Sequence, residues 1–248
     1  SRKISALMIV HVQGNMCDMD RLLAICNDYK IPVLEDAAEA LGAKYKGQYA
    51  GTLGDIGCFS FNGNKIMSTG GGGMIVSCNT EYLKRAKHLT TTAKRNALTY
   101  FHDEVGYNYR LVNVLAALGV AQLEQLDSFI ASKIDTASYY RDNLQGVGDV
   151  GFQLVQDGVE SNEWLFTITT ASMQELLDYL NSNGVMSRPF WVPMNQLPMF
   201  NDNIYINQCD VSSNVHANAL SIPCSTNITR SELDIVVSSI KAFFQGKA

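Results

Sequence analysis

The first forty residues alternate short apolar runs with one stretch of helical spacing. Ser5 to Val12 is apolar and rich in β-branched residues, which is typical of a buried strand. From Asp18 to Tyr29 the apolar residues recur at helical spacing, and Asp18 is placed to cap the first turn. Ile31 to Leu34 predicts a second strand. The order strand, helix, strand predicts a βαβ unit and therefore a parallel sheet.

The next hundred residues continue with strands and then turn to helices. Cys58 to Phe61 and Met74 to Cys78 predict two strands, joined by a loop rich in Gly, Asn and Ser. Thr80 to Leu89 predicts a short helix, and Val112 to Tyr140 predicts a long helix with one break.

The pattern changes near residue 146. Trp164 to Thr170 alternates as a half-buried strand does, while Met173 to Asn181 and Ser231 to Phe244 have amphipathic helical spacing. We therefore predict an α/β fold in two domains. Residues 1–145 would form a large domain with a mixed, mostly parallel sheet, and residues 146–248 a small C-terminal α+β domain.

Composition narrows the range of partners. The 248 residues are 46% hydrophobic, and the net charge of −5 argues against nucleic acid or an anionic membrane as a general partner. The apolar runs are far shorter than the roughly 20 residues that a membrane helix needs. The six cysteines form no CxxC pair, which indicates a reduced, cytoplasmic protein. The four histidines are dispersed, so no metal site is predicted.

Two charged residues stand where predicted strands end. Ligands of open parallel sheets bind beyond the carboxyl ends of the strands, so Asp36 is a functional candidate, with an ordinary helix N-cap as the alternative. Lys65 follows the next strand, in a Gly- and Asn-rich loop. A lysine held there as the neutral amine would form a Schiff base with a carbonyl, whereas the commoner alternative is a solvated surface lysine.

A serine and a run of glycines lie close to Lys65 in the sequence. Ser60 would donate a hydrogen bond to a phosphate or simply face solvent. The run from Gly70 to Gly73 would allow a backbone cradle for phosphate. No Gly-Lys-Ser/Thr follows it, however, so a tight turn into the Met74 strand is the favoured interpretation.

In this order the segments closely resemble the DegT/DnrJ/EryC1/StrS family, which are sugar aminotransferases of the aspartate-aminotransferase fold. The resemblance covers nearly the whole chain and rests on residues 35–43, 54–61, 65, 70–74, 106–110, 188–191 and 222–225. It implies an enzyme that moves an amino group, taken from glutamate, to a keto group of a nucleotide-linked sugar. It also implies pyridoxal 5′-phosphate as the cofactor and a homodimer as the assembly.

The resemblance also implies residue roles. Lys65 would hold the cofactor as a Schiff base and then move the proton at the substrate carbon, and Asp36 would pair with the pyridine nitrogen. Ser60 would bind the cofactor phosphate. Asn108 would reach the phosphate of the partner subunit's cofactor, with Arg110 facing the same way.

Three positions bear on the cofactor's 3-hydroxyl and on the substrate. Glu39 stands where the family often has Gln, close to the 3-hydroxyl, and a carboxylate there is tolerable only if it is protonated or paired. Asn195 stands where many members have His, in a stretch that contacts substrate, and Arg188 is the other substrate-binding candidate. The loop from Phe61 to Met74 is most similar to the branch that aminates 4-keto sugars for nonulosonic acids.

Two other functions remain open. A sugar dehydratase of the same family carries His at the Schiff-base position, so Lys65 argues against it. A non-catalytic remnant that dimerises or binds a nucleotide sugar is the second, because the chain begins at Ser1. The large domain is expected to be N-terminally incomplete, since no Gly-Thr-Thr-type phosphate loop or stacking aromatic precedes Asp36. The expectation is weak cofactor binding, little transaminase activity and an exposed apolar sheet face for this chain alone.

Overall fold

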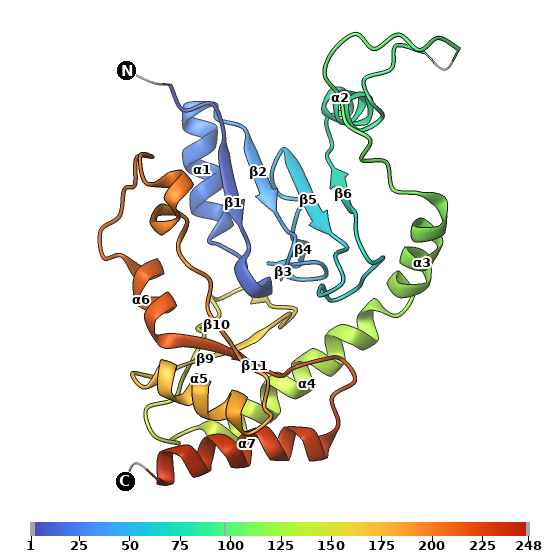
Figure 1. Ribbon diagram of the computed structural model, residues 1–248. Helices are drawn as coiled ribbons and strands as arrows, with labels where there is room; N and C mark the ends of the chain where they lie inside the picture. Colours follow the sequence, from blue (N-terminus) through green and yellow to red (C-terminus); the bar gives the residue numbers. More distant parts are fainter. Residues whose placement is uncertain (1–2, 97, 247–248) are drawn as a thin grey trace. The chain divides into compact units, whose positions relative to one another are not determined.

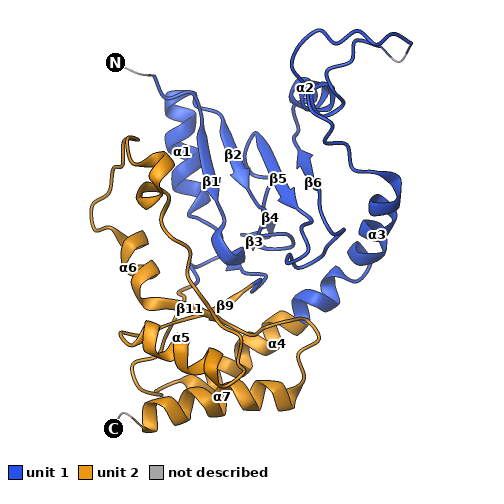
Figure 2. Cartoon of the chain, viewed as in Figure 1, with its two compact units in different colours: residues 1–131, 155–164 blue, residues 132–154, 165–248 orange. Residues whose placement is uncertain are grey.

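The computed structural model describes residues 3–96 and 98–246, which form two compact units (Figures 1 and 2). Unit 1 comprises residues 1–131 and 155–164, and unit 2 comprises residues 132–154 and 165–248. The chain therefore leaves unit 2 after residue 154 and re-enters it at residue 165. The domain boundary expected at residues 145 and 146 falls within the first stretch of unit 2 and stays a prediction.

Unit 1 is built on a four-stranded sheet in the order β1-β2-β5-β6 (Figure 1). The first three strands are parallel and the last is antiparallel to its neighbour: β1 (Leu7–Val10), β2 (Val33–Asp36), β5 (Ile56–Ser60) and β6 (Gly73–Val76). Helix α1 (Met19–Tyr29) joins β1 to β2, and the Asp18 carboxylate accepts the Arg21 N–H as its N-cap. The predicted βαβ unit and the mixed, mostly parallel sheet are confirmed.

One face of this sheet is buried and the other is open. Ile9 and Val33 are buried in the same apolar cluster as Met19 and Cys26 of α1. On the opposite face Met8 and Val10 remain 63% and 42% exposed. Because side chains alternate along a strand, the exposed face is the one on which Asp36 lies, beside Val10 in the register.

The rest of unit 1 consists of a small sheet and two helices. The small sheet is antiparallel, in the order β4-β3-β8, with β3 (Lys44–Tyr45), β4 (Gln48–Tyr49) and β8 (Val159–Glu160). Helix α2 (Thr80–Thr90) follows β6 as expected. A 3-10 turn, η1 (Val12–Gly14), follows β1.

The predicted long helix is broken into two, α3 (Asn113–Leu123) and α4 (Leu126–Leu144). At the break the Gln125 N–H bonds the carbonyl of Gln122 in place of the residue four positions back. No single helix within the described residues is long and apolar enough to cross a membrane. Only α3 and α4 taken jointly, across their break, would have that length and composition.

Unit 2 has the α+β character that the sequence indicates. Its antiparallel sheet runs in the order β10-β11-β9-β7 and has helices α5, α6 and α7. The bounds are β7 (Gly151–Phe152), β9 (Phe166–Thr169), α5 (Met173–Ser182), β10 (Arg188–Pro189), η2 (Met194–Gln196), η3 (Pro198–Phe200), α6 (Val211–Asn218), β11 (Ala219–Ile222) and α7 (Arg230–Gln245). Ile168, Leu176, Leu220 and Ile240 are fully buried in its core.

A fully buried ion pair joins the residue after β1 to strand β2 in unit 1. His11 Nε2 is 2.9 Å from Glu35 Oε2, and both side chains are 0% exposed. The Glu35 carboxylate also accepts the backbone N–H groups of Gly51, Leu53 and Gly54. One side chain thus ties together the residue after β1, strand β2 and the turn that precedes β5.

The two pKa values of this pair move apart. Burial alone would disfavour the charge on His11, but hydrogen bonds to the side chains of Cys17 and Glu35 outweigh it and raise the pKa of His11 to about 9. Burial likewise works against the Glu35 charge, yet the bonds from His11 and from the three N–H groups hold the pKa of Glu35 below its usual value. The pair is therefore ionised around neutral pH.

This pair predicts an alkaline loss of stability. The pKa of His11 is raised above its ordinary 6.5, so its stabilisation is complete below pH 6.5 and disappears as the pH rises through about 9. We expect the free energy of unfolding to fall by roughly 2–3 kcal/mol more over this range in the wild type than in His11→Gln. Urea unfolding of both proteins at stepped pH measures the difference, and parallel curves would contradict it.

Candidate functional site

The candidate site begins at the carboxyl edge of the unit 1 sheet, where β2 ends at Asp36. The backbone at this residue is fixed on both sides, because His11 N–H donates to the Asp36 carbonyl and Ala37 N–H donates to the Cys58 carbonyl. The Asp36 side chain accepts the Ala38 N–H at 3.0 Å. Turns follow and no helix begins at Ala37, so the helix-cap interpretation of Asp36 is wrong.

A row of side chains continues from Asp36 onto β5. Cys58 is the register partner of Asp36. Burial, and then the neighbouring Asp36 charge, raise the pKa of the Cys58 thiol. Ser60 is two residues further along, on the same face of the strand, and its Oγ accepts the Asn62 N–H at 3.3 Å. A carboxylate, a thiol and a hydroxyl therefore lie in order on the open face.

The loop that carries Lys65 is closed at its base. Phe61 N–H donates to the Gly72 carbonyl, and Thr69 N–H donates to the Phe61 carbonyl. Gly72 has φ +91°, a backbone conformation that glycine adopts without strain, and β6 begins at the next residue. The glycine run is thus the tight turn that the sequence favours. Within this loop the Lys65 side chain is only 13% exposed, so it is not a solvated surface lysine.

The amine of Lys65 lies between a carboxylate and an aromatic ring. Its Nζ is 3.5 Å from Glu39 Oε1 and 4.0 Å from the ring centroid of Trp164. The other carboxylate oxygen of Glu39 accepts the Gln13 N–H at 2.7 Å. Glu39 is therefore a paired carboxylate. Pairing is one of the two conditions, with protonation as the other, under which a carboxylate is expected to be tolerated at this position.

Asn108 and Arg110 lie on the long loop that follows α2. Both line a cavity of about 930 Å³ that Cys58, Gly72 and Ile75 also line. This loop therefore lies close to Cys58, which belongs to the row of side chains on the open face of β5. Asn108 itself is exposed and forms a β-bridge with Thr91. The structure describes no contact between Asn108 and Lys65.

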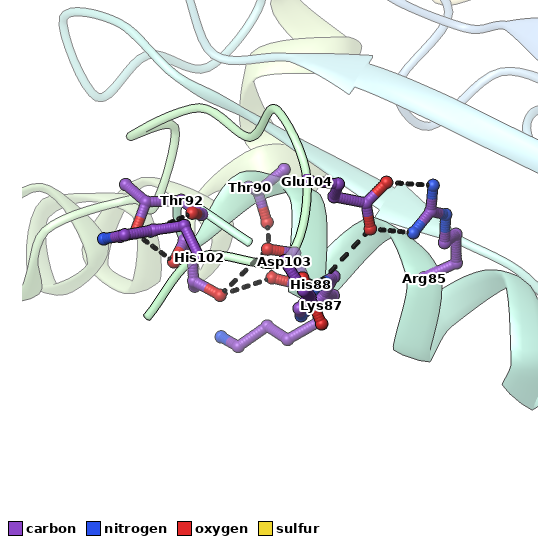
Figure 3. A network of polar contacts seen from close by, with 9 residues as sticks. Arg85, Lys87, His88, Thr90, Thr92, His102, Asp103 and Glu104 are labelled. Carbon is purple, nitrogen blue, oxygen red and sulfur yellow. Dashed lines mark hydrogen bonds and ion pairs between the residues drawn. The ribbon is translucent and has the colours of Figure 1, made fainter. Parts of the chain in front are cut away.

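A polar network anchors the same loop to α2 (Figure 3). His88 Nε2 lies 2.7 Å from Asp103 Oδ1 and 3.3 Å from Glu104 Oε1, and Arg85 pairs with Glu104. The hydrogen bond from His88 lowers the pKa of Asp103. These residue types would suit a cation, but both carboxylates already form hydrogen bonds with Arg85 or His88, and the network serves to hold the loop.

The two substrate-binding candidates belong to unit 2. Arg188 is the first residue of β10 and is exposed, and Asn195 is half-buried in η2. The other site residues that the sequence singled out lie in unit 1: Asp36, Glu39, Ser60, Lys65 and Asn108.

Three residues at the site escaped the sequence reasoning. Gln13 is 2% exposed with φ +58°, and its side-chain nitrogen has no hydrogen-bond partner among the described residues. Asn162 and Trp164 are buried beside Glu39 and Lys65. A polar residue directly after a predicted strand was the available signal for Gln13. Asn162 and Trp164 lie 97 or more residues from Lys65 in the sequence, so no local pattern links them to it.

Comparison with known proteins shows the family that the chain resembles along its length. A model of the DegT/DnrJ/EryC1/StrS aminotransferase family matches residues 1–241. A GDP-perosamine synthase of Escherichia coli O157:H7 is 33% identical over 255 residues, which cover 100% of this chain and 68% of that protein. A UDP-4-amino-4,6-dideoxy-N-acetyl-beta-L-altrosamine transaminase of Campylobacter jejuni is 28% identical, over 97% of this chain and 66% of that protein.

A solved structure has the same fold. The crystal structure of DesV from S. venezuelae, in complex with a ketimine intermediate, matches with a TM-score of 0.89 and 27% sequence identity. The match covers 97% of this chain and 65% of that one. The chain spans between 63% and 68% of the length of the curated relatives it matches.

Proposed function

Since the chain belongs to the DegT/DnrJ/EryC1/StrS aminotransferase family, we propose that it carries the chemistry of a sugar aminotransferase. The reaction would move an amino group, taken from glutamate, to a keto group of a nucleotide-linked sugar. The observation that carries the proposal is the sequestered amine of Lys65 in the loop beyond β5, in the unit where β2 ends at Asp36. The names of two relatives, a GDP-perosamine synthase and a UDP-sugar transaminase, support the substrate class.

Aminotransferases of this family use pyridoxal 5′-phosphate, and the donor set of this chain fits that group. An amine (Lys65), a carboxylate (Asp36) and a hydroxyl (Ser60) are the partners that an aldehyde, a ring nitrogen and a phosphate require. When bound, the cofactor would supply an electron sink and a temporary place for the amino group.

Each residue has a separate task in the proposal. Lys65 would hold the cofactor and move the proton at the substrate carbon. Asp36 would keep the ring nitrogen protonated, because an anion fixed at the strand end favours a cation beside it. Ser60 would bind the phosphate and Glu39 would lie close to the 3-hydroxyl. Arg188 and Asn195 would bind substrate.

The cellular setting follows the same reasoning. All six cysteines are free in the structure, which suits a reducing compartment, and we propose the cytoplasm. The dehydratase alternative stays unfavoured. The dehydratases of the family carry His at the Schiff-base position, where this chain has Lys65. A remnant without activity is the other outcome that the following experiments separate.

The Lys65 assignment predicts a single labelled lysine. After incubation with pyridoxal phosphate and borohydride reduction, peptide mapping should place the pyridoxyl group on Lys65, because its amine is held at the site. Lys65→Arg should abolish the label and Lys94→Arg, a change in the loop after α2, should leave it in place. A label on any other lysine sinks the assignment.

Asp36 should matter more for amino transfer than for cofactor attachment. Asp36→Asn keeps the side-chain size and removes the charge, so the half-reaction with glutamate should slow by roughly 100-fold or more at ~1.4 kcal/mol per decade. Labelling of Lys65 should persist. Asp28→Asn, an exposed change on α1, is the matched control. The cofactor's absorbance follows the half-reaction. If Asp36→Asn reacts at the wild-type rate, Asp36 has only a structural role.

We further propose a homodimer with α3 and the Asn108 loop at or near the contact. Val114 and Leu118 are 79% and 47% exposed on one face of α3, an apolar stripe at i, i+4 spacing. The small residues Ala116, Ala117 and Gly119 of this helix would also allow close helix approach, but Gly119 packs inward instead, since a Cβ there would lie 2.9 Å from Thr69 Cγ2.

Light scattering tests the dimer. Leu118→Asp should shift the wild-type dimer toward monomer, because a charge would be buried in the contact. Ile25→Asp, at a 53% exposed position on α1, should not. A wild-type monomer at every concentration would remove the cross-subunit role of Asn108.

A further inference from the structure

Residues 155–164 form a segment, here named the brace, that belongs to unit 1 although both of its flanks belong to unit 2. Its middle pairs with the small sheet as β8, in the register Lys44 with Glu160 and Tyr45 with Val159. Beyond β8 the brace continues to Asn162 and Trp164. These two residues contact the two loops that carry Glu39 and Lys65.

Asn162 holds the Glu39 loop through its side-chain amide. It is 0% exposed, and its Nδ2 donates to the carbonyls of Glu39 and Leu41, both at 2.9 Å. Its Oδ1 accepts the Trp164 N–H at 3.0 Å, so each polar atom of the amide is used. A Cβ on Gly14 would lie 1.7 Å from that Oδ1. The turn after β1 can therefore approach Asn162 only because residue 14 is glycine.

Trp164 holds the Lys65 loop in two ways. It is 3% exposed, and its indole Nε1 donates to the carbonyl of Asn64 at 2.8 Å. Its ring lies 4.0 Å from Lys65 Nζ, at which distance the face of an indole attracts an ammonium group. The first contact fixes the backbone one residue before Lys65, and the second fixes the far end of the side chain.

We propose that Asn162 and Trp164 are positioning residues that hold Glu39 and Lys65 in a single arrangement, Lys65 through direct contact and Glu39 through its backbone. A lysine side chain is a flexible four-carbon stem, so a lysine held at both its backbone and its Nζ keeps the nitrogen at one position, from which it reacts with a carbonyl once it has lost its proton. This proposal rests on the proposed role of Lys65. A core aromatic without such a role would affect the stability of unit 1 as a whole and would not act on Lys65 selectively.

Two substitutions at Trp164 separate the contacts. Trp164→Phe keeps an aromatic face and loses the N–H, and Trp164→Leu loses both. With pyridoxal phosphate as the probe, borohydride trapping and mass mapping give the initial labelling rate at every lysine in one sample. We expect the Lys65 rate to fall about threefold in Trp164→Phe and about tenfold in Trp164→Leu. The rate at Lys84, which pairs with Glu81 on α2, should not change. Trp191→Leu, which removes the other tryptophan, from unit 2, is the control.

Backbone hydrogen exchange provides a second measurement that needs no cofactor. The Lys65 N–H bonds the Asn62 carbonyl, and this amide should exchange about threefold or more faster in Trp164→Phe, while the amides of β1 keep wild-type rates. Wild-type labelling and wild-type exchange at Lys65 in a folded Trp164→Phe protein would overturn the proposal, and Trp164→Phe decides the matter if Trp164→Leu does not fold. If the wild-type protein is labelled at another lysine, the assignment of Lys65 is refuted instead. The hydrogen-exchange rates then still test the role of the brace.

Discussion

The arrangement of unit 1 depends on the buried carboxylate of Glu35. An anion without water is unfavourable unless donors surround it, and here an imidazolium and three backbone N–H groups do so. These donors come from the residue after β1 and from the turn before β5, on either side of β2. Because Asp36 follows Glu35 directly, satisfying the charge beneath the sheet also fixes the backbone that presents Asp36 above it.

A similar principle recurs nearer the surface of the site. Glu39 is held by a backbone N–H of Gln13 on one side and by the Lys65 amine on the other. Both carboxylates are therefore anchored to the segment that follows β1. The candidate residues lie at strand ends and in the loops that follow them: Asp36 ends β2 and Ser60 ends β5, whereas Glu39 and Lys65 lie in the loops beyond.

The sequence predicted those elements that depend on residues close together along the chain. The spacing of α1 and its Asp18 cap were both confirmed. Strand β2 starts two residues later than expected, after Pro32, which has no N–H to donate to a ladder, and so it ends on Asp36. The order of Asp36, Ser60 and Lys65 along the chain indicated the candidate site, and the roles of these residues stay a prediction. The contacts of Trp164 and Asn162 were not predictable, because they join residues about a hundred positions apart.

That separation has a consequence for the order of assembly during synthesis. The amine of Lys65 emerges from the ribosome long before the tryptophan that will face it, and the carbonyl of Glu39 waits 123 residues for its amide partner. A nascent chain that ends before residue 155 would have the four-stranded sheet of unit 1 but not the contacts of Asn162 and Trp164 with the loops that carry Glu39 and Lys65. Domains usually fold in turn from the N-terminus as they are translated. Here the contacts around Lys65 in unit 1 would be completed only after residues 132–154 of unit 2 have been synthesised.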